Sequence, residues 1–192
     1  MDIVIAAFFA SMPPGFYLAF IRDQGQPWYI PKEEKDRRKA AGEKHFDDWR
    51  EIGMVVFGLP FGILTWRMTV AAGDGAWWAA AWGVFAYAAT ALAWSQGHKE
   101  ALDLSDLRDW LVDLGMGAAV TAGPAIALAA HGHYLLAPLV LLAGAFKAPA
   151  YAIGYALRGR GDVPWPHPTA IGAILHAMVA YAVTNAALAA CL

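Results

Sequence analysis

Long apolar stretches without any charged residue dominate the chain. Short polar segments separate them, and the stretches run over Ile3–Ile21, Ile52–Trp66, Gly75–Gly97, Leu114–Phe146 and Val163–Leu192. An uncharged apolar run of about 18 residues or more is what a helix needs to cross the hydrocarbon core of a bilayer. The pattern therefore predicts an all-α fold, a polytopic membrane helix bundle.

The positions of glycine-containing turns set the expected number of spans. Leu114–Phe146 is too long for one helix across a core of about 30 Å. His131–Gly132–His133 lies near its middle, Gly73–Asp74–Gly75 follows an earlier run, and both sequences are typical of tight turns. We therefore expect one integral-membrane domain over residues 1–192 with six transmembrane helices, at about 3–21, 52–71, 76–96, 110–130, 134–157 and 169–190.

The first apolar run is as long as that of a signal peptide, but it lacks the sequence features that flank one. It carries Asp2 in place of a basic leader segment and has no clear small-residue cleavage pattern, so we expect a retained span. Pro13 and Pro14 each lack a backbone donor and are expected to kink or break this helix. Full and partial crossing of the membrane both stay open.

Basic residues gather on one side of this arrangement. The charged loop 22–50 holds eight Lys and Arg residues, and the two other loops of that side hold Lys99, Arg108, Arg158 and Arg160. Cytoplasmic loops carry an excess of Lys and Arg. We therefore expect these loops to be cytoplasmic, both termini to face outward, and the protein to lie in the bacterial cytoplasmic (inner) membrane.

Composition narrows the classes of function. With 59% hydrophobic and 16% charged residues, the chain is unlike a soluble or disordered protein, and its single cysteine, Cys191, excludes an internal disulfide. A net charge of −2 gives no basic surface for nucleic acid. The chain has no phosphate-binding glycine loop, nucleophile elbow or HExxH motif. We expect no cofactor, and the pattern favours a protein that is not an enzyme.

Lys147 is the residue that most strongly indicates a site. It precedes Leu157 by ten residues, which places it about 15 Å from the cytoplasmic end of its helix, near the middle of the bilayer. A lysine at that depth normally faces a partner or a water-filled cavity. We expect a polar intramembrane cluster of Lys147 with Asp113, His176 and Tyr151. A substrate, proton or lipid-headgroup site and a structural tie between helices are both consistent with it.

A second group of candidates is acidic. Asp106, Asp109 and Asp113 lie at i, i+3 and i+7, on one face of a helix, and His98 precedes them. Carboxylates grouped in this way can hold Mg²⁺ or Mn²⁺, so Asp106, Asp109 and His98 are candidate metal ligands. The alternative is helix capping and charge complementarity at a helix N-terminus.

Residues 31–50 form the one long polar segment. Glu33 with Arg37 and Glu34 with Arg38 are i, i+4 pairs that favour a helix. We expect a charged helix beside the membrane. It is either a solvated connector or an interaction surface for lipids or a protein, formed by Lys32, Lys35, Arg37, Arg38 and Lys39.

Short motifs give a resemblance over about residues 52–190. They are Gln96-Gly97-His98, Asp113-Leu114-Gly115 and the run Lys147-Ala148-Pro149-Ala150-Tyr151. With these the chain resembles uncharacterised multi-pass membrane proteins encoded in bacteriophage and prophage genomes. The resemblance implies a phage or bacterial origin and no particular activity.

Three functions are consistent with these features. We expect a phage-associated inner-membrane protein that acts through protein or lipid contacts, with membrane lipids and a second copy, or a membrane or virion protein, as partners. The alternative is a small channel or transporter with a polar path through Lys147 and His176. A second alternative is a membrane-embedded enzyme that uses the Asp106, Asp109 and Asp113 face on lipid headgroups.

Overall fold

The computed structural model describes residues 36–37, 40–41, 46–97, 106–159 and 168–192. The expected first span, His98 and most of the expected interaction loop (Lys32, Lys35, Arg38 and Lys39) lie outside the described residues, whereas Arg37 is described and exposed. All regular structure in the described ranges is helical, which confirms the all-α class.

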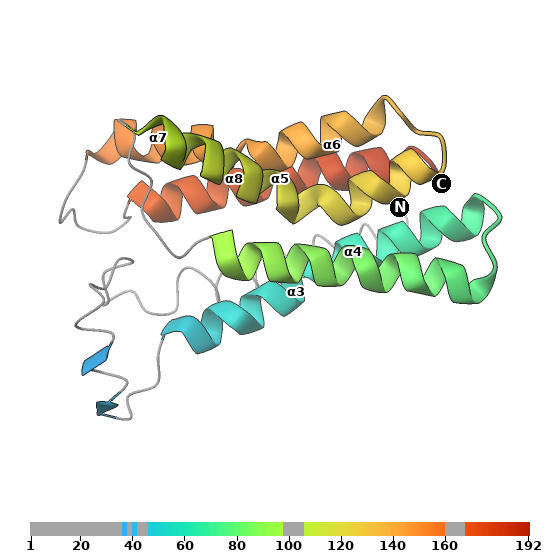
Figure 1. Ribbon diagram of the computed structural model, residues 1–192, viewed down its shortest axis with the longest axis horizontal. Helices are drawn as coiled ribbons and strands as arrows, with labels where there is room; N and C mark the ends of the chain where they lie inside the picture. Colours follow the sequence, from blue (N-terminus) through green and yellow to red (C-terminus); the bar gives the residue numbers. More distant parts are fainter. Residues whose placement is uncertain (1–35, 38–39, 42–45, 98–105, 160–167) are drawn as a thin grey trace.

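The described helices form an elongated bundle (Figure 1). They are α3 (Phe46–Ala71), α4 (Ala76–Gly97), α5 (Leu107–Ala130), α6 (Leu136–Ala145), α7 (Lys147–Arg158) and α8 (Pro168–Ala189). The helices α3 and α4 form one hairpin, and α5 forms a second hairpin with α6. The last helix, α8, packs mainly against α7 and also against α6 and α3.

Four stretches of the described chain are long and apolar enough to cross a membrane. They are Ala76–Ala93, Leu107–Ala130, Leu136–Arg158 and Ile171–Ala189. Each coincides with a span predicted from the sequence, as expected of a helical membrane protein. The predicted span at 134–157 is made of two helices in succession, α6 and α7. Residues 52–71, which were predicted as a further span, lie within α3, and α3 is not among these four stretches.

Two tight turns and the C-terminus lie at the same end of the bundle, which we call the hairpin end (residues 72–75, 131–135 and 190–192; Figure 1). Gly73 has φ +97° and Gly132 has φ +85°. Glycine adopts this left-handed region without steric cost, which explains why it stands at both turns. Both predicted turns are thus confirmed. We call the opposite end, where α4 and α7 finish and α5 and α8 begin, the loop end.

Neighbouring helices approach one another at small residues. A Cβ atom added to Gly62 of α3 would lie 2.9 Å from the carbonyl oxygen of Gly83 of α4, and the reverse distance is the same. Two threonine hydroxyls also donate to carbonyl oxygens of a neighbouring helix at 2.8 Å: Thr90 to Val120 and Thr121 to Val140. Helices in membranes associate through contacts of this kind, because lipid provides little hydrophobic drive for association.

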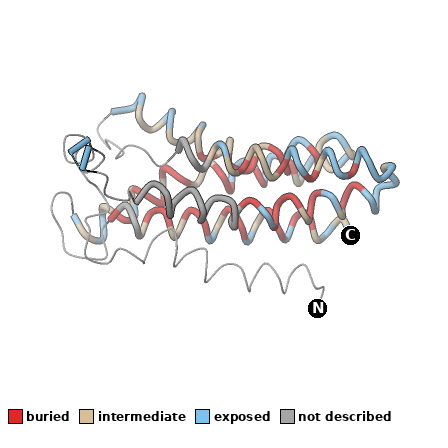
Figure 2. Tube along the Cα trace, turned by 90° about the horizontal axis from the view of Figure 1, so that it is seen from below, coloured by how far each residue is buried: buried red, intermediate tan, exposed pale blue. Residues whose placement is uncertain are grey.

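The bundle buries one side of each helix and exposes large apolar side chains on the other (Figure 2). Toward the hairpin end, an apolar core includes Leu64, Met68, Leu128, Val140 and Leu188. Trp77 and Trp78, at the start of α4, are 90% and 73% exposed. Tryptophan at a span end is typical of the boundary between lipid and water.

Candidate functional site

An ion pair between Lys147 and Asp113 lies inside the bundle. The Lys147 ammonium, on the first residue of α7, donates a hydrogen bond to Asp113 Oδ1 on α5. Their side chains are 2% and 14% exposed. A buried charge is tolerated when it is paired and hydrogen-bonded, so each residue provides the partner that the other requires.

A break in the helix places Lys147 at this position. The α-helical pattern stops after Ala145 and resumes at Lys147, with Phe146 between them. Pro149 has no N–H, so it cannot provide the hydrogen bond that the Ala145 carbonyl would receive in a continuous helix. The backbone bonds on either side are intact, because Phe146 N–H donates to Leu142 and Ala150 N–H donates to Phe146. The span is therefore interrupted only locally.

Two glycines allow α5 to approach the break between α6 and α7 closely. A Cβ atom on Gly117 would lie 2.7 Å from Lys147 Cβ and closer still to the Gly144 carbonyl oxygen. A Cβ atom on Gly144 would collide with Thr121 Oγ1 and with the Gly117 carbonyl. Only glycine at both positions lets the two backbones approach closely enough for Asp113 and Lys147 to pair.

His176 connects α8 to the same break. Its side chain is fully buried, and its Nε2 atom lies 2.8 Å from the carbonyl oxygen of Gly144. A carbonyl oxygen only accepts, so Nε2 carries the hydrogen. In the neutral ring, Nδ1 is then an acceptor. The imidazole is thus fixed in one tautomer by the carbonyl of Gly144, which precedes Lys147 by three residues in the chain.

Tyr151 completes the group from the next turn of α7. The Lys147 Nζ atom lies 5.4 Å from the centre of the Tyr151 ring, a distance at which the ring face attracts a cation. The Tyr151 side chain is buried, and Gly172 of α8 packs directly against it. The structure thus brings together all four residues expected in the polar cluster, from α5, α7 and α8.

The carboxylate of Asp113 retains hydrogen-bonding capacity. Its Oδ1 atom accepts from Lys147, whereas its Oδ2 atom is buried and has no hydrogen-bond partner in the part of the chain that the structure describes. An ionised carboxylate has about four acceptor positions. This group could therefore bind a proton, a water molecule or a polar solute on the side away from Lys147.

The candidate metal ligands are not gathered into a site in the described residues. Asp106 caps α5, since its carboxylate accepts from Arg108 N–H at 2.8 Å. Asp109 lies in the first turn of the same helix, and Asp113 pairs with Lys147. No group of three His, Cys, Asp or Glu residues able to hold a metal occurs among the described residues, and His98 lies outside them.

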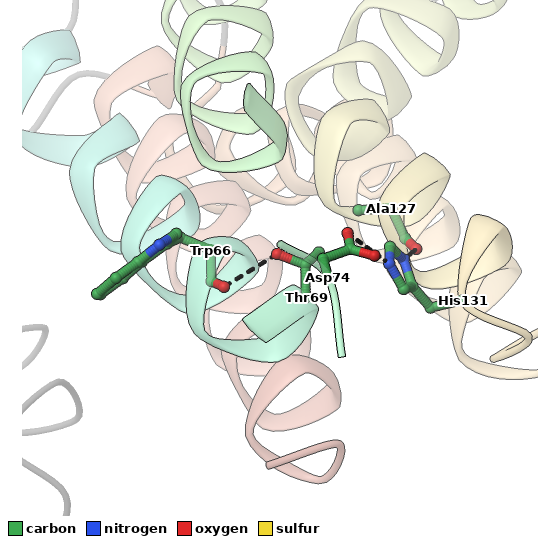
Figure 3. Close-up of polar contacts among 5 residues, drawn as sticks. All are labelled: Trp66, Thr69, Asp74, Ala127 and His131. Atoms are coloured by element: carbon green, nitrogen blue, oxygen red, sulfur yellow. Dashed lines mark hydrogen bonds and ion pairs between the residues drawn. The ribbon is translucent and has the colours of Figure 1, made fainter. Parts of the chain in front are cut away.

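A second polar contact, which the sequence did not indicate, joins the two turns of the hairpin end. His131 Nε2 lies 3.0 Å from Asp74 Oδ2, and His131 Nδ1 lies 2.7 Å from the carbonyl oxygen of Ala127 (Figure 3). The side chains of His131 and Asp74 are 12% and 27% exposed. The contact ties the α3–α4 turn to the end of α5. Fifty-seven residues separate the partners in the chain, so no local pattern could have predicted it.

Comparison of this chain with protein-family models, with curated proteins and with solved structures found no match. Its function is therefore inferred from the site itself. The strongest feature of that site is the ion pair of Lys147 and Asp113 beside the buried imidazole of His176, at an interruption in a membrane-length helical segment.

Proposed function

We propose that this chain is a small transporter or channel of a bacterial cytoplasmic membrane in which protons move past Lys147 and Asp113. The observation that supports the proposal is the burial of Lys147 and His176, with Asp113 largely enclosed beside them, within apolar helices next to the interruption at Phe146. Ionisable residues within membrane spans are costly and commonly mark ion or proton pathways. Interrupted helices near mid-membrane are typical of transporter binding sites.

Each residue has a distinct role in the proposed path. Asp113 is the more exposed member of the ion pair and lies in the half of α5 nearer the loop end, so it is the group that protons from that side reach. A proton that binds Asp113 removes the charge that holds the Lys147 ammonium. The ammonium then turns toward the Tyr151 ring or toward His176. Release of the proton restores the ion pair.

Proton flux in proteoliposomes tests this function. Purified protein is reconstituted with an internal pH-sensitive dye, and a potassium diffusion potential drives proton entry. We expect flux in the wild type and its loss in the double variant Lys147→Met with Asp113→Leu. This variant removes both ionisable groups without leaving one of them buried alone, so it is expected to fold.

The control for this experiment is Arg108→Ala, which removes an exposed cation in the first turn of α5. It is expected to conduct like the wild type. Flux that is absent in the wild type, or equal in the wild type and the double variant, would overturn the proposal. Size-exclusion profiles in detergent check that all proteins are folded, and the amount of protein in the purified vesicles checks that they are equally incorporated.

A second candidate is a phage-associated protein that acts at the host membrane through protein or lipid contacts. The close approach of Gly117 and Gly144 favours it, because such tight packing suits an ion pair that serves as a fixed tie between α5 and α7. In that case the double variant retains function, and the functional surface is the charged segment 31–50. Charge reversal at Arg37 and Arg38 would then abolish copurification of a partner.

Cys191 provides a test of the proposed orientation. It is the only cysteine in the chain and follows α8 at the hairpin end. Partial burial raises the pKa of its thiol, and Sγ donates to the Ala187 carbonyl at 3.3 Å. Maleimides react with the thiolate, so labelling is expected to be slow at neutral pH and to accelerate as the pH rises toward the raised pKa.

With the C-terminus outward, a membrane-impermeant maleimide at about pH 8.5 is expected to label spheroplasts without lysis. Cys191→Ser is the control for labelling of other proteins. Labelling that requires lysis would place the hairpin end in the cytoplasm and reverse the orientation.

A further inference from the structure

Three polar atoms in the half of the bundle nearer the hairpin end are enclosed by protein. They have no hydrogen-bond partner within the described ranges: Thr65 Oγ1 on α3, and Thr184 Oγ1 and Asn185 Oδ1 on α8. The two threonines are fully buried and Asn185 is 8% exposed. Buried polar groups in folded proteins almost always have a partner, and an ordered water or ion is the usual explanation when no protein atom provides one.

The packing of α3 on α8 brings these atoms to one level. Both helices run toward the hairpin end, and Phe61 of α3 stacks on Tyr181 of α8 with ring centres 4.6 Å apart. Thr65 lies one turn beyond Phe61, and Asn185 lies one turn beyond Tyr181. Residues four apart share a helix face. Thr65 and Asn185 are therefore at a similar level along the two helices, and Thr184 directly precedes Asn185 in the chain.

Apolar groups close this position along both directions of the helix axes. The stacked rings of Phe61 and Tyr181 cover it toward the loop end. One turn further toward the hairpin end, Met68 and Leu188 belong to the same buried apolar cluster. The polar atoms thus lie between two apolar layers of the α3–α8 interface, a position that we call the chamber.

The hydrogen bonds already present show which kind of partner the three unpaired polar atoms require. Asn185 Nδ2 donates to the Tyr181 carbonyl at 2.7 Å, which leaves its Oδ1 atom as an acceptor. Each threonine hydroxyl can donate one hydrogen bond and accept others. The missing partner must therefore both donate, to Asn185 Oδ1, and accept, from the hydroxyls.

We propose that a buried water molecule occupies this chamber and bridges Thr65 to Asn185 and Thr184. Water meets the requirement, since a buried water typically makes about three hydrogen bonds. A bare cation suits the position less well, because the hydroxyl and amide oxygens are neutral and provide no counter-charge in an apolar interior. This hydration site lies on α3 and α8 away from Lys147, so it is independent of the proposed transport function.

The sign of the effect of Thr65→Val tests the proposal. Valine has nearly the shape of threonine but cannot bond to the water. If the water is present, the variant loses a hydrogen bond, and the thermal midpoint of the protein in detergent is expected to fall by about 2–4 °C. If the chamber is dry, valine replaces an unsatisfied hydroxyl, and the midpoint is unchanged or higher. Thr65→Ser keeps the hydroxyl and is the matched control, with a midpoint close to that of the wild type.

Nuclear magnetic resonance provides the direct measurement. We expect a nuclear Overhauser effect between water and the Asn185 side-chain amide in the wild type and in Thr65→Ser, and its loss in Thr65→Val. A midpoint that does not fall in Thr65→Val, or absence of the water signal in the wild type, would overturn the proposal. So would a wild-type midpoint that rises when sodium chloride replaces choline chloride, since this would identify a bound cation.

Discussion

Lys147→Met is expected to destabilise the folded protein by about 3 kcal/mol. The substitution removes the ammonium and leaves the Asp113 carboxylate largely buried without its counter-charge. Breaking a buried ion pair from one side typically costs about 3–5 kcal/mol, and the residual exposure of Asp113 favours the lower end of this range. Reversible unfolding in mixed micelles, followed by circular dichroism, measures the change.

The double variant Lys147→Met with Asp113→Leu provides the comparison. It removes both charges and is expected to recover most of the lost stability, because apolar residues of similar volume can replace a buried ion pair at little cost. The two single variants would then show a strong coupling free energy in a double-mutant cycle. Equal stability of Lys147→Met and the wild type would contradict the buried pairing. A double variant as unstable as Lys147→Met would show that the unpaired Asp113 carboxylate is not the cause of the lost stability.

Gly117→Ala is expected to lower stability by about 1–3 kcal/mol and to weaken the ion pair. The new methyl group would overlap the Gly144 carbonyl and lie 2.7 Å from Lys147 Cβ, so α5 must move away from α6 and α7. Overpacking of a close contact costs energy of this order. The same movement separates Asp113 from Lys147, so we expect this variant to reduce proton flux as well. The thermal midpoint and the flux assay provide the two measurements.

Gly115→Ala is the matched control on the same helix. A Cβ atom at Gly115 would meet nothing within 4 Å, so the substitution is expected to stabilise α5 by about 0.5–1 kcal/mol through reduced backbone freedom. If stability falls in Gly117→Ala and rises in Gly115→Ala, the close contact of Gly117 with α6 and α7 is the cause of the loss. A Gly117→Ala protein as stable as Gly115→Ala would show that the two backbones do not approach so closely.

The helices and turns that depend on a local sequence pattern could be predicted from the sequence. Uncharged runs fixed the positions of α4, α5 and α8, and the glycines at Gly73 and Gly132 marked two turns that the structure confirms. The division of one expected span into α6 and α7 was not predicted. Its signal was present as Pro149, but hydrophobicity alone does not distinguish a continuous helix from an interrupted one.

The part of the site that depends on depth in the membrane could be predicted from the sequence. Lys147 was expected near the middle of the bilayer, where a charge requires a partner, so its pairing with Asp113 followed from electrostatics. The bond from His176 to the Gly144 carbonyl could not be foreseen, because it depends on the local backbone at the break. The Asp74–His131 contact depends on how two hairpins pack, which no single-helix pattern encodes.

The missing hydrogen bond at Pro149 has a mechanical consequence. Upstream of it, α6 is held to α5 by Gly144 and Thr121, whereas downstream α7 is held to α8 by Gly154 and Gly172. The segment therefore consists of two helices joined at Phe146, and the tightest glycine contacts of each are with a different neighbour. Bending at this joint would move α7 and α8 relative to α5 and α6, and it would strain the Lys147–Asp113 and His176–Gly144 contacts that cross the joint. The ammonium at the pivot would then be the first charge to change its surroundings.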